Sequence, residues 1–204
     1  MTGIRRDDGI TMIEVVVSLT LMAVLMTIFT TAVLEVYRNV NQTEALSSGQ
    51  SQLNTVFLRL DKEVRYASGI SREKQLGNGD WYVEYLNTSR GAEICTELRL
   101  TTAGLLQRRT WDRNVTPLQP SGWALIASGL GTVDGFQPFT FEAADPEKVA
   151  NAEGGSNFHR LTITLAALGP NDKHVAESSI TFAALNTSLA TTSAGTCTEG
   201  RVVT

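Results

Sequence analysis

The sequence predicts an α+β protein in which a long N-terminal helix precedes an antiparallel β-sheet head. Residues 15–34 contain no charged side chain, and a helix of that length crosses about 30 Å of hydrocarbon at ~1.5 Å per residue. The first proline is Pro117, so the helix can continue beyond the apolar stretch. After residue 70, short segments rich in β-branched and aromatic residues alternate with turn residues, a pattern typical of strands.

The helix is expected to have an amphipathic second half. Its apolar residues recur at the spacing of a single helical face: Leu53, Val56, Phe57, Leu60 and Val64. We expect this face to pack against the head. Gly69 is the predicted helix stop, and the polar stretch 39–52, with Gly49, is predicted to bend or fray.

The head is predicted from its strand-forming segments and the turns between them. A loop is expected over residues 143–157, which contain Pro146, Gly154 and Gly155. One meandering antiparallel sheet should pack on the helix. The predicted strands are residues 81–86, 94–101, 105–111, 123–127, 136–141, 161–165 and 179–185.

A short motif precedes the apolar stretch. The sequence of residues 9–14 is Gly-Ile-Thr-Met-Ile-Glu, and Glu14 is a lone carboxylate at the start of the apolar helix. Because a charge is energetically costly in a membrane, its presence there indicates a function. This start resembles the processing site of type IV prepilins. The resemblance implies a lollipop-shaped pilin fold, cleavage by a membrane peptidase between Gly9 and Ile10, and N-methylation of Ile10.

The residues around the cleavage site depart from the family pattern in two ways. Ile10 stands where the family usually has phenylalanine, and Asp7 and Asp8 precede the glycine where many members have a basic residue. Arg5 and Arg6 would stay cytoplasmic by the positive-inside rule. The alternative interpretation is an uncleaved signal anchor that holds an extracytoplasmic domain.

These features divide the chain into five predicted segments. They are a prepilin leader (1–9), the transmembrane half of the helix (10–36), its amphipathic half (37–69), the β-rich head (70–187) and a Ser/Thr-rich tail (188–204).

Glu14 is the residue to which the resemblance assigns assembly. In fibres of the family, this glutamate is thought to neutralise the amino terminus of a neighbouring subunit. Burying an ammonium or a carboxylate alone costs several kcal/mol, and pairing them offsets much of that cost. The alternative is a solvated Glu14 at the level of the lipid headgroups.

The head is also similar to one branch of the superfamily. The helix end at residues 58–67, the segment 123–130 before an aromatic strand, and the final hairpin resemble those of J-type minor pseudopilins and W-type minor pilins. The absence of a proline from the apolar helix also favours a minor subunit over a major one.

Cys95 and Cys197 are the only cysteines. A disulfide between them would persist in an extracytoplasmic compartment and would anchor the tail. The alternative is two unpaired thiols.

No residues form a recognisable catalytic, metal or cofactor motif. His159 and His174 lack ligands at metal-binding spacing. The acidic residues between 145 and 157 lack the calcium-loop pattern, so a solvated loop is preferred to a calcium site. Arg108, Arg109 and Arg113 are expected on a solvated strand edge, and with a net charge of −4 no nucleic-acid partner is predicted.

We therefore expect a non-enzymatic minor pilin or pseudopilin of a type IV pilus or type II secretion-like fibre. It would span the cell membrane once, with its N-terminus cytoplasmic and its head extracytoplasmic, before entering the fibre. Its expected partners are other pilins or pseudopilins through the N-terminal helix, the prepilin peptidase, an inner-membrane assembly platform and the lipid bilayer. The alternatives are a membrane-anchored binding module that does not polymerise and, less favoured, a membrane-tethered enzyme.

Overall fold

The computed structural model describes residues 11–89, 91–151, 155–169 and 174–197. The chain divides into two units, Met1–Glu44 and Ala45–Thr204. Helix α1 (Met12–Arg65) begins in the first unit and continues into the second. The expected α+β order, a long N-terminal helix followed by antiparallel sheets, is confirmed.

Helix α1 is helical throughout residues 39–52, so the predicted frayed turn is wrong. Gly49 serves close packing instead. A Cβ atom at position 49 would lie 2.7 Å from the Cβ of Ala167 in strand β9 (His159–Leu168). Glycine therefore lets the helix approach the sheet at this point.

Gly69 is not the helix stop. Helix α1 ends at Arg65, and Gly69 lies in strand β1 (Gly69–Ile70). The main-chain carbonyl of Arg65 accepts a 2.9 Å hydrogen bond from the N–H of Leu185, and the carbonyl of Tyr66 accepts one from the Asn186 side chain. These distant residues satisfy carbonyls that a helix end leaves without partners.

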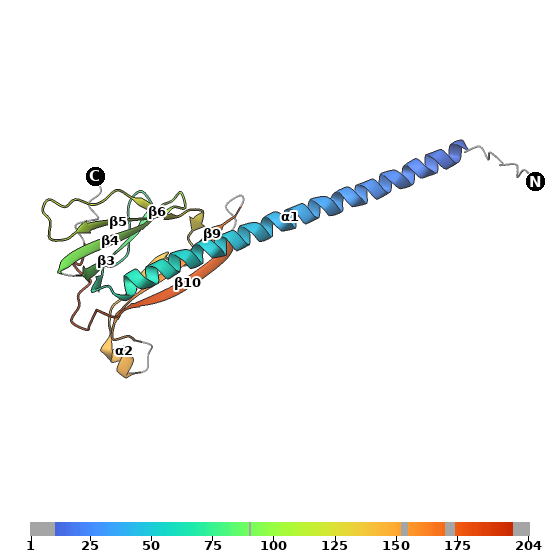
Figure 1. Ribbon diagram of the computed structural model, residues 1–204. Coiled ribbons are helices and arrows are strands. Elements are labelled where there is room, and N and C mark those ends of the chain that lie inside the picture. Colours follow the sequence, from blue (N-terminus) through green and yellow to red (C-terminus); the bar gives the residue numbers. More distant parts are fainter. Residues whose placement is uncertain (1–10, 90, 152–154, 170–173, 198–204) are drawn as a thin grey trace, which may run out of the picture. The chain divides into compact units, whose positions relative to one another are not determined.

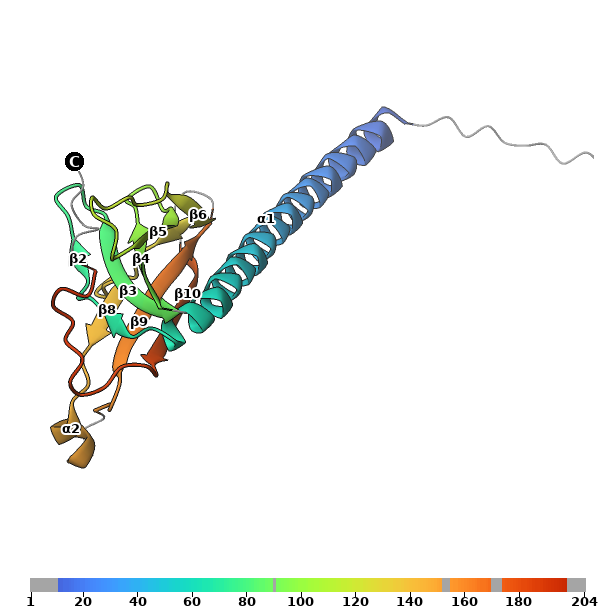
Figure 2. The same ribbon diagram turned by 60° about the vertical axis from the view of Figure 1, so that its left-hand side comes forward.

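The strands form two antiparallel sheets rather than the single expected meander (Figures 1 and 2). The chain changes sheet at a short turn, where the N–H of Leu130 donates to the carbonyl of Gly104 in the β4–β5 hairpin. The six-stranded sheet holds β1, β2 (Lys74–Gln75), β3 (Trp81–Ser89), β4 (Ala92–Leu100), β5 (Leu106–Asp112) and β6 (Ala124–Ala127). The four-stranded sheet holds β7 (Leu130–Gly131), β8 (Phe139–Glu142), β9 and β10 (His174–Ala184).

The loop predicted over residues 143–157 contains a short helix, α2 (Pro146–Ala150). The side chain of Asp145 accepts a 3.1 Å hydrogen bond from the N–H of Glu147, so it caps the helix. Proline at the first helical position has no N–H that needs a partner. In both views α2 projects from the body of the head (Figures 1 and 2).

The amphipathic face of α1 packs as predicted. Its five apolar residues are buried in one core with side chains from both sheets. The rings of Phe57 and Phe182 lie 6.3 Å apart, which joins the helix to β10. Since a buried aliphatic or aromatic side chain contributes about 1.5–3 kcal/mol, the second half of α1 is an integral part of the head.

Candidate functional site

The apolar stretch of α1 is the first part of the candidate site. Within the described residues, α1 is the one helix long and apolar enough to cross a membrane. Its large apolar side chains are exposed from Met12 to Val40, so no core formed by the described residues accounts for them. An exposed apolar surface of this length requires lipid or other apolar helices around it.

The threonine hydroxyl groups in this stretch are satisfied within the helix. Thr20 donates to the carbonyl of Val16 at 2.7 Å, and Thr27 donates to that of Val24 at the same distance. Thr31 makes similar bonds one turn further on. Because hydrocarbon offers no hydrogen-bond partners, this arrangement makes the threonines compatible with an apolar surrounding.

Glu14 lies in the first turn of α1, and its side chain is exposed. The N–H of Glu14 donates to Thr11, to the carbonyl at 3.0 Å and more weakly to the hydroxyl at 3.4 Å. Thr11 is therefore the N-cap, and Glu14 occupies the third helical position. A carboxylate there also interacts favourably with the helix dipole.

Thr11 was missed as a site residue in the sequence. The pattern Thr-x-x-Glu before an apolar run is a recognised helix-start signal and could have identified it. Gly9 and Ile10, the residues of the predicted cleavage, lie outside the described part of the chain. The predicted cleavage and N-methylation therefore stay predictions.

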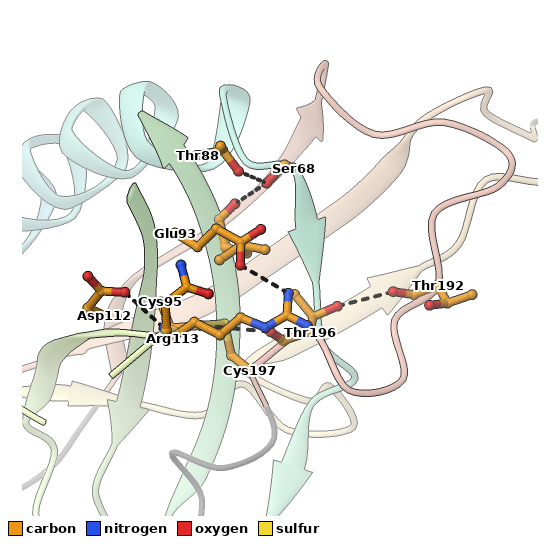
Figure 3. The surroundings of a disulfide bond; sticks show 11 residues. Ser68, Thr88, Glu93, Cys95, Asp112, Arg113, Thr192, Thr196 and Cys197 are labelled. Carbon is orange, nitrogen blue, oxygen red and sulfur yellow. Dashed lines mark hydrogen bonds and ion pairs between the residues drawn. A yellow bond between two sulfur atoms is a disulfide. The ribbon is translucent and has the colours of Figure 1, made fainter. Parts of the chain in front are cut away.

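The two cysteines form the predicted disulfide (Figure 3). Cys95 lies on β4, and Cys197 reaches it from the C-terminal tail, with a Cα–Cα distance of 5.9 Å. Both residues are completely buried. Beside the disulfide, Arg113 and Glu93 form an ion pair between the end of β5 and β4.

The disulfide belongs to a second, smaller apolar cluster. Leu86, Trp111 and Leu118 pack around the two cysteines. Thr196 lies close to the backbone of Gly69, where a Cβ atom would come within 2.8 Å of its methyl group. The tail is thus packed against the six-stranded sheet at Thr196 and Cys197.

Arg108 and Arg109 do not lie on a solvated strand edge, whereas Arg113 is exposed just beyond the end of β5. Strand β5 pairs with β4 on one side and β6 on the other. Arg108 contacts Glu63 at 2.5 Å, Arg109 pairs with the fully buried Glu97, and Arg113 pairs with Glu93. These side chains are committed to ion pairs within the head, which the sequence alone does not reveal.

The two histidines, His159 and His174, have different surroundings and different partners. His159 is buried, and its Nε2 lies 3.0 Å from the carbonyl of Thr191. Exposed His174 contacts Glu177 at 3.2 Å. Among the described residues, no three histidine, cysteine, aspartate or glutamate side chains come together as a metal site would require.

Residues 4–30 match the family model of the prokaryotic N-terminal methylation motif. No curated protein and no solved structure matches the chain. The match covers the basic leader residues, the Gly9–Glu14 motif and most of the apolar run. With the apolar helix, it supports membrane anchoring and pilin-type partners. The N-terminal segment is therefore similar to that of pilin-like and pseudopilin subunits of the type IV prepilin superfamily.

Proposed function

We propose that this protein is a minor pilin or pseudopilin, a non-enzymatic subunit of a type IV pilus or a type II secretion-like fibre. The carrying observation is the methylation motif over residues 4–30, followed by a helix whose apolar surface is exposed and which begins with Glu14. Such a helix can pass from lipid into a bundle of similar helices without exposing its apolar surface to water.

The proposed sequence of events starts in the cell membrane, with residues 1–9 cytoplasmic and the head extracytoplasmic. The prepilin peptidase cuts between Gly9 and Ile10 and methylates Ile10. An inner-membrane assembly platform then transfers the subunit to the fibre, where its helix packs on those of other pilins. The buried disulfide supports an extracytoplasmic head, because such bonds persist in oxidising compartments.

We assign the subunit to the J-type pseudopilin or W-type minor pilin class. The support is the sequence similarity at the end of α1 and in residues 123–130, together with an apolar helix that lacks proline.

Intact-mass measurement on the chain isolated from its native membrane, followed by isolation of the fibres, tests the proposal. We expect a chain that begins at Ile10 and carries one added methyl group, present in the fibre fraction. An uncleaved chain that is absent from every fibre would instead favour the membrane-anchored binding module that does not polymerise.

A further inference from the structure

The outer edge of strand β10 is an open sheet edge. β10 is eleven residues long and pairs with β9 on one side. Among the described residues, no strand pairs with its other side. An open edge presents main-chain donors and acceptors that can bind another strand.

The hydrogen bonds of β9 show which groups of β10 point outward. The N–H of Thr164 donates to Pro138 beside β8, and that of Leu168 donates to Gly129 beside β7. Because main-chain groups alternate in direction along a strand, the main-chain groups of Ile163 face β10, where Ile163 pairs with Ile180. The main-chain groups of Ile180 therefore point to β9. The outward groups of β10 are therefore those of Glu177, Ser179, Thr181 and Ala183.

These outward groups continue a row whose last member already has a partner. The N–H of Leu185, next in the row, donates to the carbonyl of Arg65. No described residue makes a hydrogen bond to the main chain of the four residues before it. On the opposite side of the same sheet, Glu73 accepts a 3.0 Å hydrogen bond from the N–H of Phe141 in β8, so that edge is partly capped by a side chain.

The β10 edge also lacks the features that normally prevent strand addition. Residues 178–184 contain no charged residue and no proline, and the irregularity in pairing lies near the start of the strand, between His174 and Ala176. Natural proteins commonly protect open edges with charges, prolines or bulges. Their absence over seven residues is what a strand-binding surface requires.

We propose that this edge binds an extended strand of a neighbouring, different pilin-type subunit, an inference that rests on the proposed function. On the outer face, the hydroxyls of Thr181 and Ser179 each lie 2.8 Å from a threonine hydroxyl on β9. On the opposite face, Ile180 is 37% exposed. The added strand would therefore alternate serine or threonine with aliphatic residues.

A second copy of this chain fits the edge less well. β10 lies alongside the last turns of α1 (Figure 1). Antiparallel pairing of two β10 strands would make residues 53–64 of α1 run in opposite directions through the two heads, so the two chains would enter their heads from opposite sides. Parallel pairing about a two-fold axis would place the hydroxyl row of each copy on the face where the other carries its helix.

Amide hydrogen exchange of the full-length chain tests the proposal, alone in detergent micelles and in isolated assemblies with its pilin-type partners. The amides of Ser179 and Thr181 should exchange at least tenfold more slowly in the assembly, which is about 1.4 kcal/mol of protection. Those of Ile180 and Phe182, which point to β9, should be slow in both samples.

A pair of variants at one position separates the edge from the side chain. Thr181→Pro removes an outward N–H and should reduce recovery with the partners at least tenfold, with a melting temperature close to that of Thr181→Val, which lacks the same hydroxyl. Thr181→Val keeps that N–H, so its recovery with the partners should fall much less than that of Thr181→Pro. Ile180→Pro removes a bond to β9 and should lower the melting temperature, which checks the assigned direction.

Three outcomes would overturn the inference. The first is an assembly that contains the chain while Ser179 and Thr181 exchange as fast as before, which leaves the proposed function intact. The second is equal protection in the isolated chain, or protection that rises with its concentration, as self-pairing would give. The third is absence of the chain from any pilin assembly, which would overturn the proposed function as well.

Discussion

The hydroxyl of Tyr85 donates a 2.6 Å hydrogen bond to the carboxylate of Glu63. Glu63 lies near the end of α1, and Tyr85 is completely buried on β3. The other carboxylate oxygen of Glu63 contacts Arg108 of β5 at 2.5 Å. One helix carboxylate therefore joins two strands of the six-stranded sheet, fixing the rotation of the helix against them.

Tyr85→Phe should destabilise the head. Hydrogen bonds to charged groups contribute about 1.5–3 kcal/mol, and we expect a loss in this range in the free energy of unfolding by urea. Tyr82→Phe is the matched control, because Tyr82 is equally buried but its hydroxyl lies 3.5 Å from Asp80. Equal losses in the two variants would contradict a special role for the Glu63 contact.

The hydrogen bond between Tyr85 and Glu63 also leads us to expect that the head loses stability in alkali. Burial, together with the negative charge of Glu63, raises the pKa of Tyr85 well above its usual value of 10.0. The raised pKa favours the neutral phenol in the folded state, so its contribution is complete below pH 10 and is lost as pH rises through the folded pKa. Urea midpoints above pH 10 should fall less steeply for Tyr85→Phe than for the parent.

Gly49→Ala should destabilise the head even though alanine favours helices. In an exposed helix the substitution gains about 1 kcal/mol, but here the new methyl group would meet Ala167 at 2.7 Å. Urea unfolding should show a net loss, and the double variant with Ala167→Gly should recover part of it. A single variant more stable than the parent would show that the helix can move away at no cost.

Reduction of the disulfide should lower the free energy of unfolding. Cys95 and Cys197 are 102 residues apart, and the chain-entropy model gives about 4–5 kcal/mol for a loop of this length. Urea unfolding with and without reductant measures the difference. The Cys95→Ser/Cys197→Ser double variant is the control and should not respond to reductant; a parent that is equally indifferent would contradict the prediction.

His159 should make the head sensitive to acid. His159 is 1% exposed, and its ring lies edge-on to that of Phe141 at 5.0 Å. Burial lowers the pKa of His159 below the usual 6.5. The unfolded chain then binds the proton more readily, so stability should fall as pH drops from 6.5 to the folded pKa and level off below it.

The pH profile of urea midpoints between pH 8 and 4 tests this expectation. His159→Asn should flatten the profile just below pH 6.5, and His174→Asn, at an exposed residue, is the control for the loss of a histidine. A parent profile that is flat across this window would refute the assignment.

Glu14→Ala should impair assembly and spare folding. If the carboxylate pairs with a neighbour's amino terminus in a buried site, its removal costs about 3–5 kcal/mol. We expect normal cleavage and an unchanged melting temperature of the head, with reduced recovery of fibres and of co-purified pilins. The prediction fails if the variant enters fibres as well as the parent in a strain without another copy, or is degraded before cleavage.

The long helix and its core face were predictable because periodicity depends on local sequence alone. Leu53 to Val64 recur at helical spacing, and their burial follows from it. The disulfide was predictable because only two cysteines exist. In the candidate site, Glu14 was found from its isolation within an apolar run.

The predictions that the structure contradicts have a common cause, which is contact between residues distant in sequence. From local sequence alone, Gly49 and Gly69 resemble the glycines of a bend and of a helix stop. In the structure each allows close packing against a residue more than 100 positions away. Arg108 and Arg109 were predicted to be solvated because their ion-pair partners, Glu63 and Glu97, belong to other elements of the fold. The division into two sheets likewise involves a distant contact, between the N–H of Leu130, where the second sheet begins, and the carbonyl of Gly104.

The continuity of α1 has a mechanical consequence. The helix that carries the apolar stretch ends inside the core of the head. The carbonyls of Arg65, its last residue, and of Tyr66 are bonded to Leu185 and Asn186, just after β10. Tension on the anchor would therefore reach the head through buried side chains and not through a loop that can unravel. The load would have to shear Leu53 to Val64 past both sheets together, so the head should yield in a single step at high force.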